Sequence, residues 1–270
     1  MDTLLRELIQ ALDPETRNSI ALVGGQALSI WGLHYLINEL TGEEFAHLSS
    51  IDIDFLGRSP EVVRCAAAWH QQPTQPSPFD STPHTAIFLL DHDLYGQPLF
   101  DQGGNRTKIT VDFLDHVHGV PDKELLHGMD VIVLDDDYQL RLLTPALCLK
   151  SRYHNLHSLP YGPKRLPREI VRARLAANVT RAYLIDLLEH PENLRRALDW
   201  SKIVVNLALS HAGIQVSVKY GLEPLDAIPE AHRGFSDDFR NKYFTAMKEK
   251  IARKRESYLK RLSSSPEDMS

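Results

Sequence analysis

Hydrophobic residues follow two different spacings in this chain, and the change between them falls near its middle. In the first 140 residues, short apolar or alternating runs typical of strands are interspersed with segments of helical periodicity. The predicted strands are residues 19–23, 51–56, 85–90, 107–117 and 131–134. The predicted helices are residues 2–12, 26–38 and 60–69, and the predicted loops are residues 39–49 and the proline-rich residues 71–84.

From about residue 141 the helical spacing prevails. Thr144 and Pro145 form a typical helix start, with the threonine at the N-cap and the proline at the first helical position. Further helices are predicted at residues 168–189, 192–212 and 236–262. The pattern therefore predicts an α+β (α/β) chain, with an α/β domain over residues 1–140 and a mostly helical domain over residues 141–270.

The charged residues divide at the same place. The formal net charge is −6, but residues 1–140 carry 7 Lys and Arg against 22 Asp and Glu, whereas residues 141–270 carry 23 against 14. An acidic half suits metal ions, and a basic half can attract a polyanion such as RNA. The alternative is that the basic residues only solvate helix faces. That alternative also applies to the basic C-terminal helix, which carries Lys248, Lys250, Arg253, Lys254, Arg255, Lys260 and Arg261.

Composition and cysteine usage narrow the class of protein. Hydrophobic residues make up 43% of the chain and charged residues 24%, which is ordinary for a soluble globular protein. No apolar run approaches the ~20 residues that span a bilayer, and the charged N-terminal segment is unlike a signal peptide. Cys65 and Cys148 are far apart, which favours a reducing compartment over a disulfide or a cysteine metal site. We therefore expect a cytoplasmic protein with no membrane partner.

Two aspartates share one face of the predicted strand in the segment SIDIDFL, residues 50–56. Because side chains alternate along a strand, Ile53 and Phe55 occupy the apolar face. Asp52 and Asp54 occupy the other face together with Ser50. Two adjacent carboxylates repel each other unless a cation lies between them, and their hard oxygen atoms favour Mg²⁺ or Mn²⁺.

The same alternation selects a third carboxylate on a later strand. Val111 and Phe113 belong to the apolar face of that strand, so Asp112 lies on the opposite face, whereas Asp115 falls on the apolar side and is excluded. Three aspartates from neighbouring strands could bind two metal ions. Two other acidic segments, residues 91–93 (DHD) and 135–137 (DDD), are predicted to be turns. The i, i+2 pair of His116 and His118 is read as a polar strand end.

A glycine pair precedes the first predicted pair of carboxylates. Gly24 and Gly25 stand between a predicted strand and a predicted helix in the segment VGGQAL, residues 23–28. Such a pair can serve only as a tight connection. It can also leave the amides at a helix N-terminus open to a triphosphate. Neither a Rossmann fingerprint nor a P-loop accompanies it.

Together these segments resemble a known family. VGGQAL at residues 23–28, SIDIDF at residues 50–55 and Asp112 on a later strand are similar to the DNA polymerase β-like nucleotidyltransferase superfamily. The glycine and aspartate motifs most resemble its AbiEii-type branch, which includes abortive-infection and type IV toxin–antitoxin nucleotidyltransferases. The motifs cover the first 115 residues, and a looser likeness extends to LCLKSR at residues 147–152. The stretch between Gly25 and Asp52 is longer than in the compact family pattern.

The resemblance implies a nucleotidyltransferase fold, a mixed sheet flanked by helices, with an NTP and Mg²⁺ bound between it and the helical domain. It implies that Gly24 and Gly25 cradle the triphosphate and that Ser50 hydrogen-bonds a phosphate. It implies further that Asp52 and Asp54 bind both metal ions and that Asp112 binds one and helps to deprotonate the acceptor. Lys150 would pair with the triphosphate. A surface role for Lys150 is an equal alternative, and Arg152 is a weaker candidate.

The expected reaction is transfer of an NMP from an NTP to a hydroxyl group, with release of pyrophosphate. RNA, tRNA in particular, or a protein is the expected acceptor, and a cognate toxin or antitoxin is an expected partner. Two alternatives stay open. The chain could be a catalytically inactive binding protein of a toxin–antitoxin pair, or a nucleotidyltransferase that modifies a small molecule such as an antibiotic.

Overall fold

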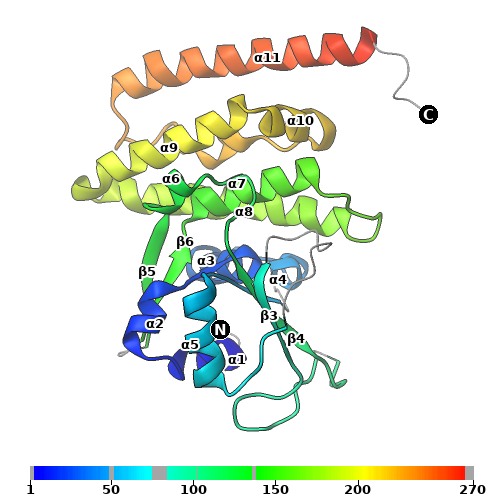
Figure 1. Cartoon of the computed structure of the whole chain (residues 1–270). Helices are drawn as coiled ribbons and strands as arrows, with labels where there is room; N and C mark the ends of the chain where they lie inside the picture. Colours follow the sequence, from blue (N-terminus) through cyan, green and yellow to red (C-terminus); the bar gives the residue numbers. More distant parts are fainter. Residues whose placement is uncertain (1–2, 49–51, 75–83, 102, 136–137, 265–270) are drawn as a thin grey trace. The chain divides into compact units, whose positions relative to one another are not determined.

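The computed structural model (Figure 1) describes residues 3–48, 52–74, 84–101, 103–135 and 138–264. The chain is an α+β protein that divides into two compact units. The first unit comprises Met1–His34 and Phe45–Thr144, and the second comprises Tyr35–Glu44 and Pro145–Ser270. The main division therefore falls after Thr144, whereas the sequence pattern places it after residue 140. In the described part of the chain, no helix combines the length and the apolar character needed to cross a membrane.

A six-stranded mixed sheet forms the first unit, with the strand order β3-β4-β2-β1-β6-β5. β1 pairs antiparallel with β2 and parallel with β6, and β2 pairs parallel with β4. β3 and β5 are antiparallel edge strands beside β4 and β6. The strands are β1 (Ala21–Val23), β2 (Ile53–Leu56), β3 (His84–Leu90), β4 (Ile109–Leu114), β5 (Met129–Asp135) and β6 (Tyr138–Leu143).

One face of this sheet is apolar and carries the core of the first unit. Phe55 on β2 and Phe113 on β4 are fully buried, and their rings lie 5.5 Å apart. Trp69 packs edge-on against Phe88 and donates a hydrogen bond of 2.9 Å from its indole nitrogen to the Leu8 carbonyl. Burial of each such side chain contributes roughly 1.5–3 kcal/mol to stability. This packing fixes which face of β2 and β4 is turned away from the core.

The helices that lie wholly or partly in the first unit include three that the hydrophobic spacing does not predict. They are α1 (Thr3–Gln10), α2 (Pro14–Ser19), α3 (Gly24–Leu36), α4 (Gly42–Leu48), α5 (Ser59–Trp69) and α6 (Asp122–Leu125). α2 begins where the Asp13 carboxylate accepts a 2.9 Å hydrogen bond from the Thr16 amide. Its last residue, Ser19, is the first residue of the strand predicted at residues 19–23, which begins only at Ala21 in the structure. α6 is a single short turn that no periodicity could indicate.

The loop prediction for residues 39–49 is wrong, because Gly42–Leu48 forms α4. The Thr41 hydroxyl accepts a hydrogen bond from the Glu44 amide, and the Glu44 carboxylate accepts one from the Thr41 amide. This reciprocal pair is a capping box, which satisfies two backbone groups at a helix start. The Thr-Gly-Glu-Glu segment was therefore a readable helix signal.

The sheet also corrects the predicted strands. The strand predicted at residues 107–117 is shorter and spans Ile109–Leu114. β6, which forms the parallel partner of β1, is not among the predicted strands, although Gln139 and Arg141 alternate with the buried Leu140 and Leu142 in the pattern of a strand. It runs across residue 140, which is why the predicted boundary between the domains does not coincide with the division between the units.

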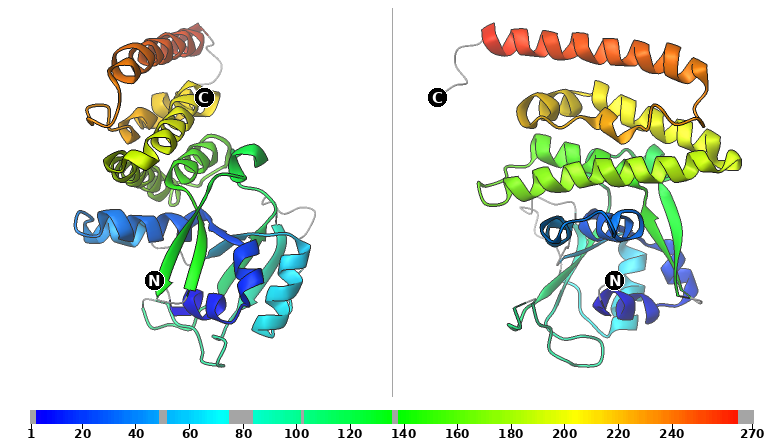
Figure 2. Two further views of the ribbon diagram at one scale, coloured as in Figure 1. Left: turned by 90° about the vertical axis from the view of Figure 1, so that its left-hand side faces the viewer. Right: turned by 180° about the vertical axis from the view of Figure 1, so that it is seen from behind.

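The second unit is mainly helical. Its helices are α7 (Pro145–Ser158), α8 (Leu166–Glu189), α9 (Leu194–Leu209), α10 (His211–Tyr220) and α11 (Thr245–Ser264), with short helical turns at Pro191–Asn193, Pro224–Ala227 and Asp238–Phe244. α7 and α8 run side by side (Figure 2). The single helix predicted over residues 192–212 ends at Ser210, whose hydroxyl accepts a 3.0 Å hydrogen bond from the Gly213 amide and so starts α10.

Candidate active site

Asp54 and Asp112 are direct neighbours on two parallel strands. They are partners in the register of β2 and β4, as are Phe55 and Phe113 one position along. Because the two phenylalanines are buried in the core, both aspartates are turned to the opposite face. The predicted juxtaposition of these two carboxylates is confirmed, whereas their role as metal ligands stays a prediction.

Gly24 holds a special position beside Asp54. It begins α3 with φ +62°, in the left-handed region that glycine adopts at little cost. A Cβ atom placed on Gly24 would lie only 1.9 Å from Oδ2 of Asp54. The absence of a side chain therefore lets this carboxylate approach the first turn of α3. The glycine pair is part of the helix itself, not a break that precedes a helix starting at Gln26.

Asp112 lies in a partly enclosed environment. Its side chain is 15% exposed, and its Oδ1 atom is buried without a hydrogen-bond partner among the described residues. Nε2 of His84 lies 3.5 Å from its Oδ2 atom. Burial, and then the negative charge of Asp52, raises the pKa of Asp112 to about 6. A cation close to this carboxylate would favour its ionised form.

His84 was not a candidate in the sequence. It is the first residue of β3 and pairs with Leu114, and an irregularity in the pairing of β3 with β4 follows it. Its contact with Asp112 depends on the antiparallel pairing of two strands whose partnership the sequence pattern does not reveal. No sequence signal distinguishes this histidine from the other twelve.

Asp52 stands just before β2 and is exposed. Among the described residues, no group of three histidine, cysteine, aspartate or glutamate side chains is already arranged as a metal site. Mutual repulsion of carboxylates keeps such oxygen atoms apart until a cation neutralises them. The oxygen donors of Asp52, Asp54 and Asp112, with the unpartnered Oδ1 of Asp112, fit a hard divalent cation.

The remaining candidates are divided between different parts of the chain. Gly25 follows Gly24 in the first turn of α3 and is buried. Ser50 lies outside the described residues. Lys150 is half-buried on α7 and belongs to the second unit, where Arg152 is buried on the same helix. Asp115, which was excluded as a ligand, is exposed just beyond β4.

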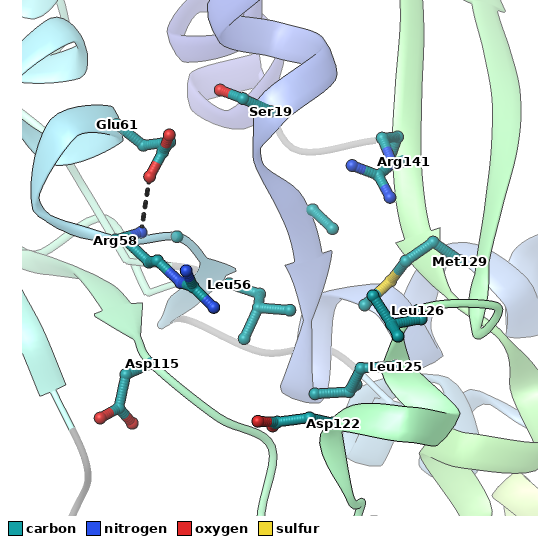
Figure 3. Close-up of a pocket in the computed structure, with 12 residues that line it drawn as sticks. Ser19, Leu56, Arg58, Glu61, Asp115, Asp122, Leu125, Leu126, Met129 and Arg141 are labelled. Atoms are coloured by element: carbon teal, nitrogen blue, oxygen red, sulfur yellow. Dashed lines mark hydrogen bonds between the residues drawn. The ribbon is translucent and has the colours of Figure 1, made fainter.

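A cavity of about 370 Å³ opens in the first unit (Figure 3). Leu56 and Ala21, which are paired across β2 and β1, contribute to its lining. Leu56 follows Asp54 by two positions, so both side chains share one face of the sheet, with Cα atoms ~7 Å apart. The lining also includes Glu61 of α5, a helix whose Trp69 packs against Phe113 on the apolar face, so the cavity lies at the ends of the strands and is not confined to the face of Asp54 and Asp112.

The cavity is lined by groups of both charges. In Figure 3, Arg58 and Arg141 lie on opposite sides of the cavity, and Asp115 and Asp122 lie in the lower part of the view. The Arg58 backbone is held by a 2.9 Å hydrogen bond from its amide to the Glu61 carboxylate. The Arg141 guanidinium donates a 2.9 Å hydrogen bond to the Asn18 carbonyl. Such a cavity could take a polar molecule with an apolar part.

No protein-family model, curated protein or solved structure matches this chain. The structure gives an α+β class with a mixed sheet, and a nucleotidyltransferase fold is a proposal that rests on the residues described above.

Proposed function

We propose that this chain is a metal-dependent nucleotidyltransferase that moves an NMP from an NTP to an acceptor hydroxyl. The observation that best supports this proposal is the three-part arrangement of Gly24, Asp54 and Asp112. Gly24 starts a helix and is close to Asp54, and Asp54 is paired with Asp112. This proximity supports a site in which helix amides bind phosphate beside carboxylates that bind a metal ion.

Each residue has a distinct role in the proposed reaction. The amides of Gly24 and Gly25 bind the triphosphate, and the carboxylates of Asp52, Asp54 and Asp112 hold Mg²⁺ or Mn²⁺. A divalent ion bound there would neutralise negative charge on the phosphates. Asp112 orients the acceptor hydroxyl and accepts its proton. The acceptor oxygen forms a bond to the α-phosphorus while the bond to the β-phosphate oxygen breaks, so pyrophosphate leaves.

The proposed acceptor class is RNA or protein, and the cavity lined by Leu56, two positions along β2 from Asp54, offers room for an acceptor group. A small-molecule acceptor such as an antibiotic would use the same three carboxylates. A toxin–antitoxin partnership belongs to the proposal through the sequence resemblance alone.

The test is to incubate the protein with Mg²⁺ and each α-labelled NTP in a total extract of RNA and protein, followed by separate incubation with aminoglycosides. Labelled RNA, labelled protein or a labelled drug would identify the acceptor class. A protein that binds NTP with Mg²⁺ but labels nothing would favour the inactive binding protein. Absence of both binding and labelling would reject the proposal.

A further inference from the structure

His84 reaches the carboxylate face of the sheet through an irregularity at the start of β3. Ala86 is paired with the core residue Phe113 and is itself buried. Because side chains alternate along a regular strand, His84 would share the core face with Ala86. The pairing shifts between these two residues, however, so that His84 is paired with Leu114 and lies on the face of Leu114 and Asp112. Bulges of this kind re-aim side chains next to active sites.

The imidazole of His84 is almost enclosed and has little to bind. Its side chain is 10% exposed, and Nδ1 is buried without a hydrogen-bond partner among the described residues. Nε2 faces Oδ2 of Asp112 at 3.5 Å, beyond the range of about 2.7–3.2 Å for an N–H···O hydrogen bond. Oδ1 of Asp112 is likewise buried without a partner. Buried polar atoms that lack partners are costly, so this pair of side chains calls for a ligand.

A second histidine–aspartate pair in the same unit shows a different geometry. Nδ1 of His92 lies 2.7 Å from Oδ1 of Asp91, in a hydrogen bond between two exposed side chains. Those two groups satisfy each other, whereas His84 and Asp112 are too far apart to do so. Two ligand atoms that share one transition-metal ion, each at about 2.1 Å, lie about 3–3.5 Å apart. The separation of His84 from Asp112 therefore fits two ligands of one ion.

A nitrogen donor changes which ion the site prefers. Asp112 and its partner Asp54 offer carboxylate oxygens, which together with water suit Mg²⁺ well. Imidazole suits transition metals instead, and their affinity for mixed nitrogen and oxygen sites exceeds that of Mg²⁺. The position of His84 beside Asp112 is thus a feature that a site built for Mg²⁺ alone would not need.

We propose that Nε2 of His84 is a ligand of the metal ion held by Asp112 and Asp54, and that the site selects a divalent first-row transition metal over Mg²⁺. The metal-binding role of the two carboxylates belongs to the proposed function, on which this assignment of His84 rests. Of the two ions expected from the sequence, Mn²⁺ is the one that His84 favours.

The test is pulsed EPR spectroscopy of the full chain with Mn²⁺ alone as the probe, without nucleotide. The wild-type spectrum should show coupling of the Mn²⁺ electron spin to a directly bound imidazole nitrogen. His84→Gln should lose this coupling, which a merely structural role of His84 would not produce. His92→Gln removes the exposed histidine of the other pair and is the matched control, so it should keep the coupling.

Calorimetry measures the selectivity of the same proteins. The wild type should bind Mn²⁺ more tightly than Mg²⁺. His84→Gln should weaken Mn²⁺ binding by about tenfold or more, since even a partner that only orients a metal ligand contributes 10- to 100-fold to affinity. The same variant should change Mg²⁺ binding by less than about twofold, because the amide oxygen of glutamine is a ligand that a hard cation accepts.

A wild-type spectrum without nitrogen coupling would overturn the proposal, whether or not His84→Gln folds. Equal losses of Mn²⁺ affinity in His84→Gln and His92→Gln would overturn it as well. Transfer of an NMP by a protein whose bound Mn²⁺ shows no nitrogen coupling would reject the role of His84 alone. Nitrogen coupling that depends on His84, without transfer to any acceptor, would reject the proposed function and leave the metal site in place.

Discussion

Gly24 and Asp54 are in contact so close that no side chain can replace the hydrogen of the glycine. A Cβ atom added to Gly24 would lie 1.9 Å from Oδ2 of Asp54, and the backbone at Gly24 has φ +62°. The first turn of α3 and the proposed metal-binding face of β2 are thereby joined at one point. In the proposed active site, this contact brings the triphosphate-binding amides and a metal-binding carboxylate together.

Gly24→Ala should therefore destabilise the protein and impair nucleotide binding. The left-handed backbone costs a non-glycine residue about 1–3 kcal/mol, and the new methyl group would also displace the Asp54 carboxylate. Chemical denaturation measures the first effect, and titration with a non-hydrolysable NTP and Mg²⁺ measures the second.

The control for that substitution is Gly42→Ala. Gly42 begins α4, and a Cβ atom placed on it meets nothing within 4 Å. This variant should keep the wild-type stability or exceed it, because alanine is the better helix former. Equal effects of the two substitutions would show that the contact with Asp54 is unimportant.

Asp112→Asn should raise the stability of the metal-free protein at alkaline pH. The pKa of Asp112 is raised from 3.8 to about 6 in the folded protein, so folding favours the protonated carboxyl group. The contribution of the Asp112 carboxyl group to the free energy of unfolding is thus greatest below pH 4 and declines as the pH rises from about 4 to 6. The uncharged amide of Asp112→Asn removes this decline.

The measurement is the unfolding temperature in EDTA from pH 4 to pH 8. The gain of Asp112→Asn over wild type should be present at pH 8 and should disappear near pH 4. A gain for Asp112→Asn that does not vary with pH would contradict the assigned cause.

α11 should be the helix of the second unit that is released most easily. Ile251 is its single buried residue among those described, and it packs against Ala208 and Ile214. Ile251→Ala should raise hydrogen exchange along α11 with a much smaller effect on α8. Leu259→Ala, at a position 49% exposed on the same helix, should leave exchange unchanged. Similar exchange in both variants would show that ion pairs, such as Arg255 with Glu223, are sufficient to hold the helix.

The sequence was most informative where a buried strand imposed strict alternation. Phe55 and Phe113 fix the orientation of β2 and β4, so Asp54 and Asp112 could be assigned to one face before their strands were known to be neighbours. The α+β class and most of the helices of the second half follow from the same periodicities.

Features set by pairing or by local capping were harder to predict. The proximity of His84 to Asp112 requires the register of β3 with β4, which no local pattern contains. The alternation of Gln139 and Arg141 with the buried Leu140 and Leu142 could likewise have indicated β6. α4 was missed although its capping box of Thr41 and Glu44 could have been read directly.

The most direct test of the central claim is the rate of labelled-NMP transfer from an NTP, with Mg²⁺ and the acceptor found in the extract, by the wild type and three variants. Asp54→Asn and Asp112→Asn should each reduce the rate by about 100-fold or more, since each removes a carboxylate that stabilises charge in the transition state. Asp91→Asn, in an exposed turn with a similar Asp-x-Asp pattern, should transfer at the wild-type rate. Transfer at the wild-type rate by Asp54→Asn or Asp112→Asn would contradict the proposed active site.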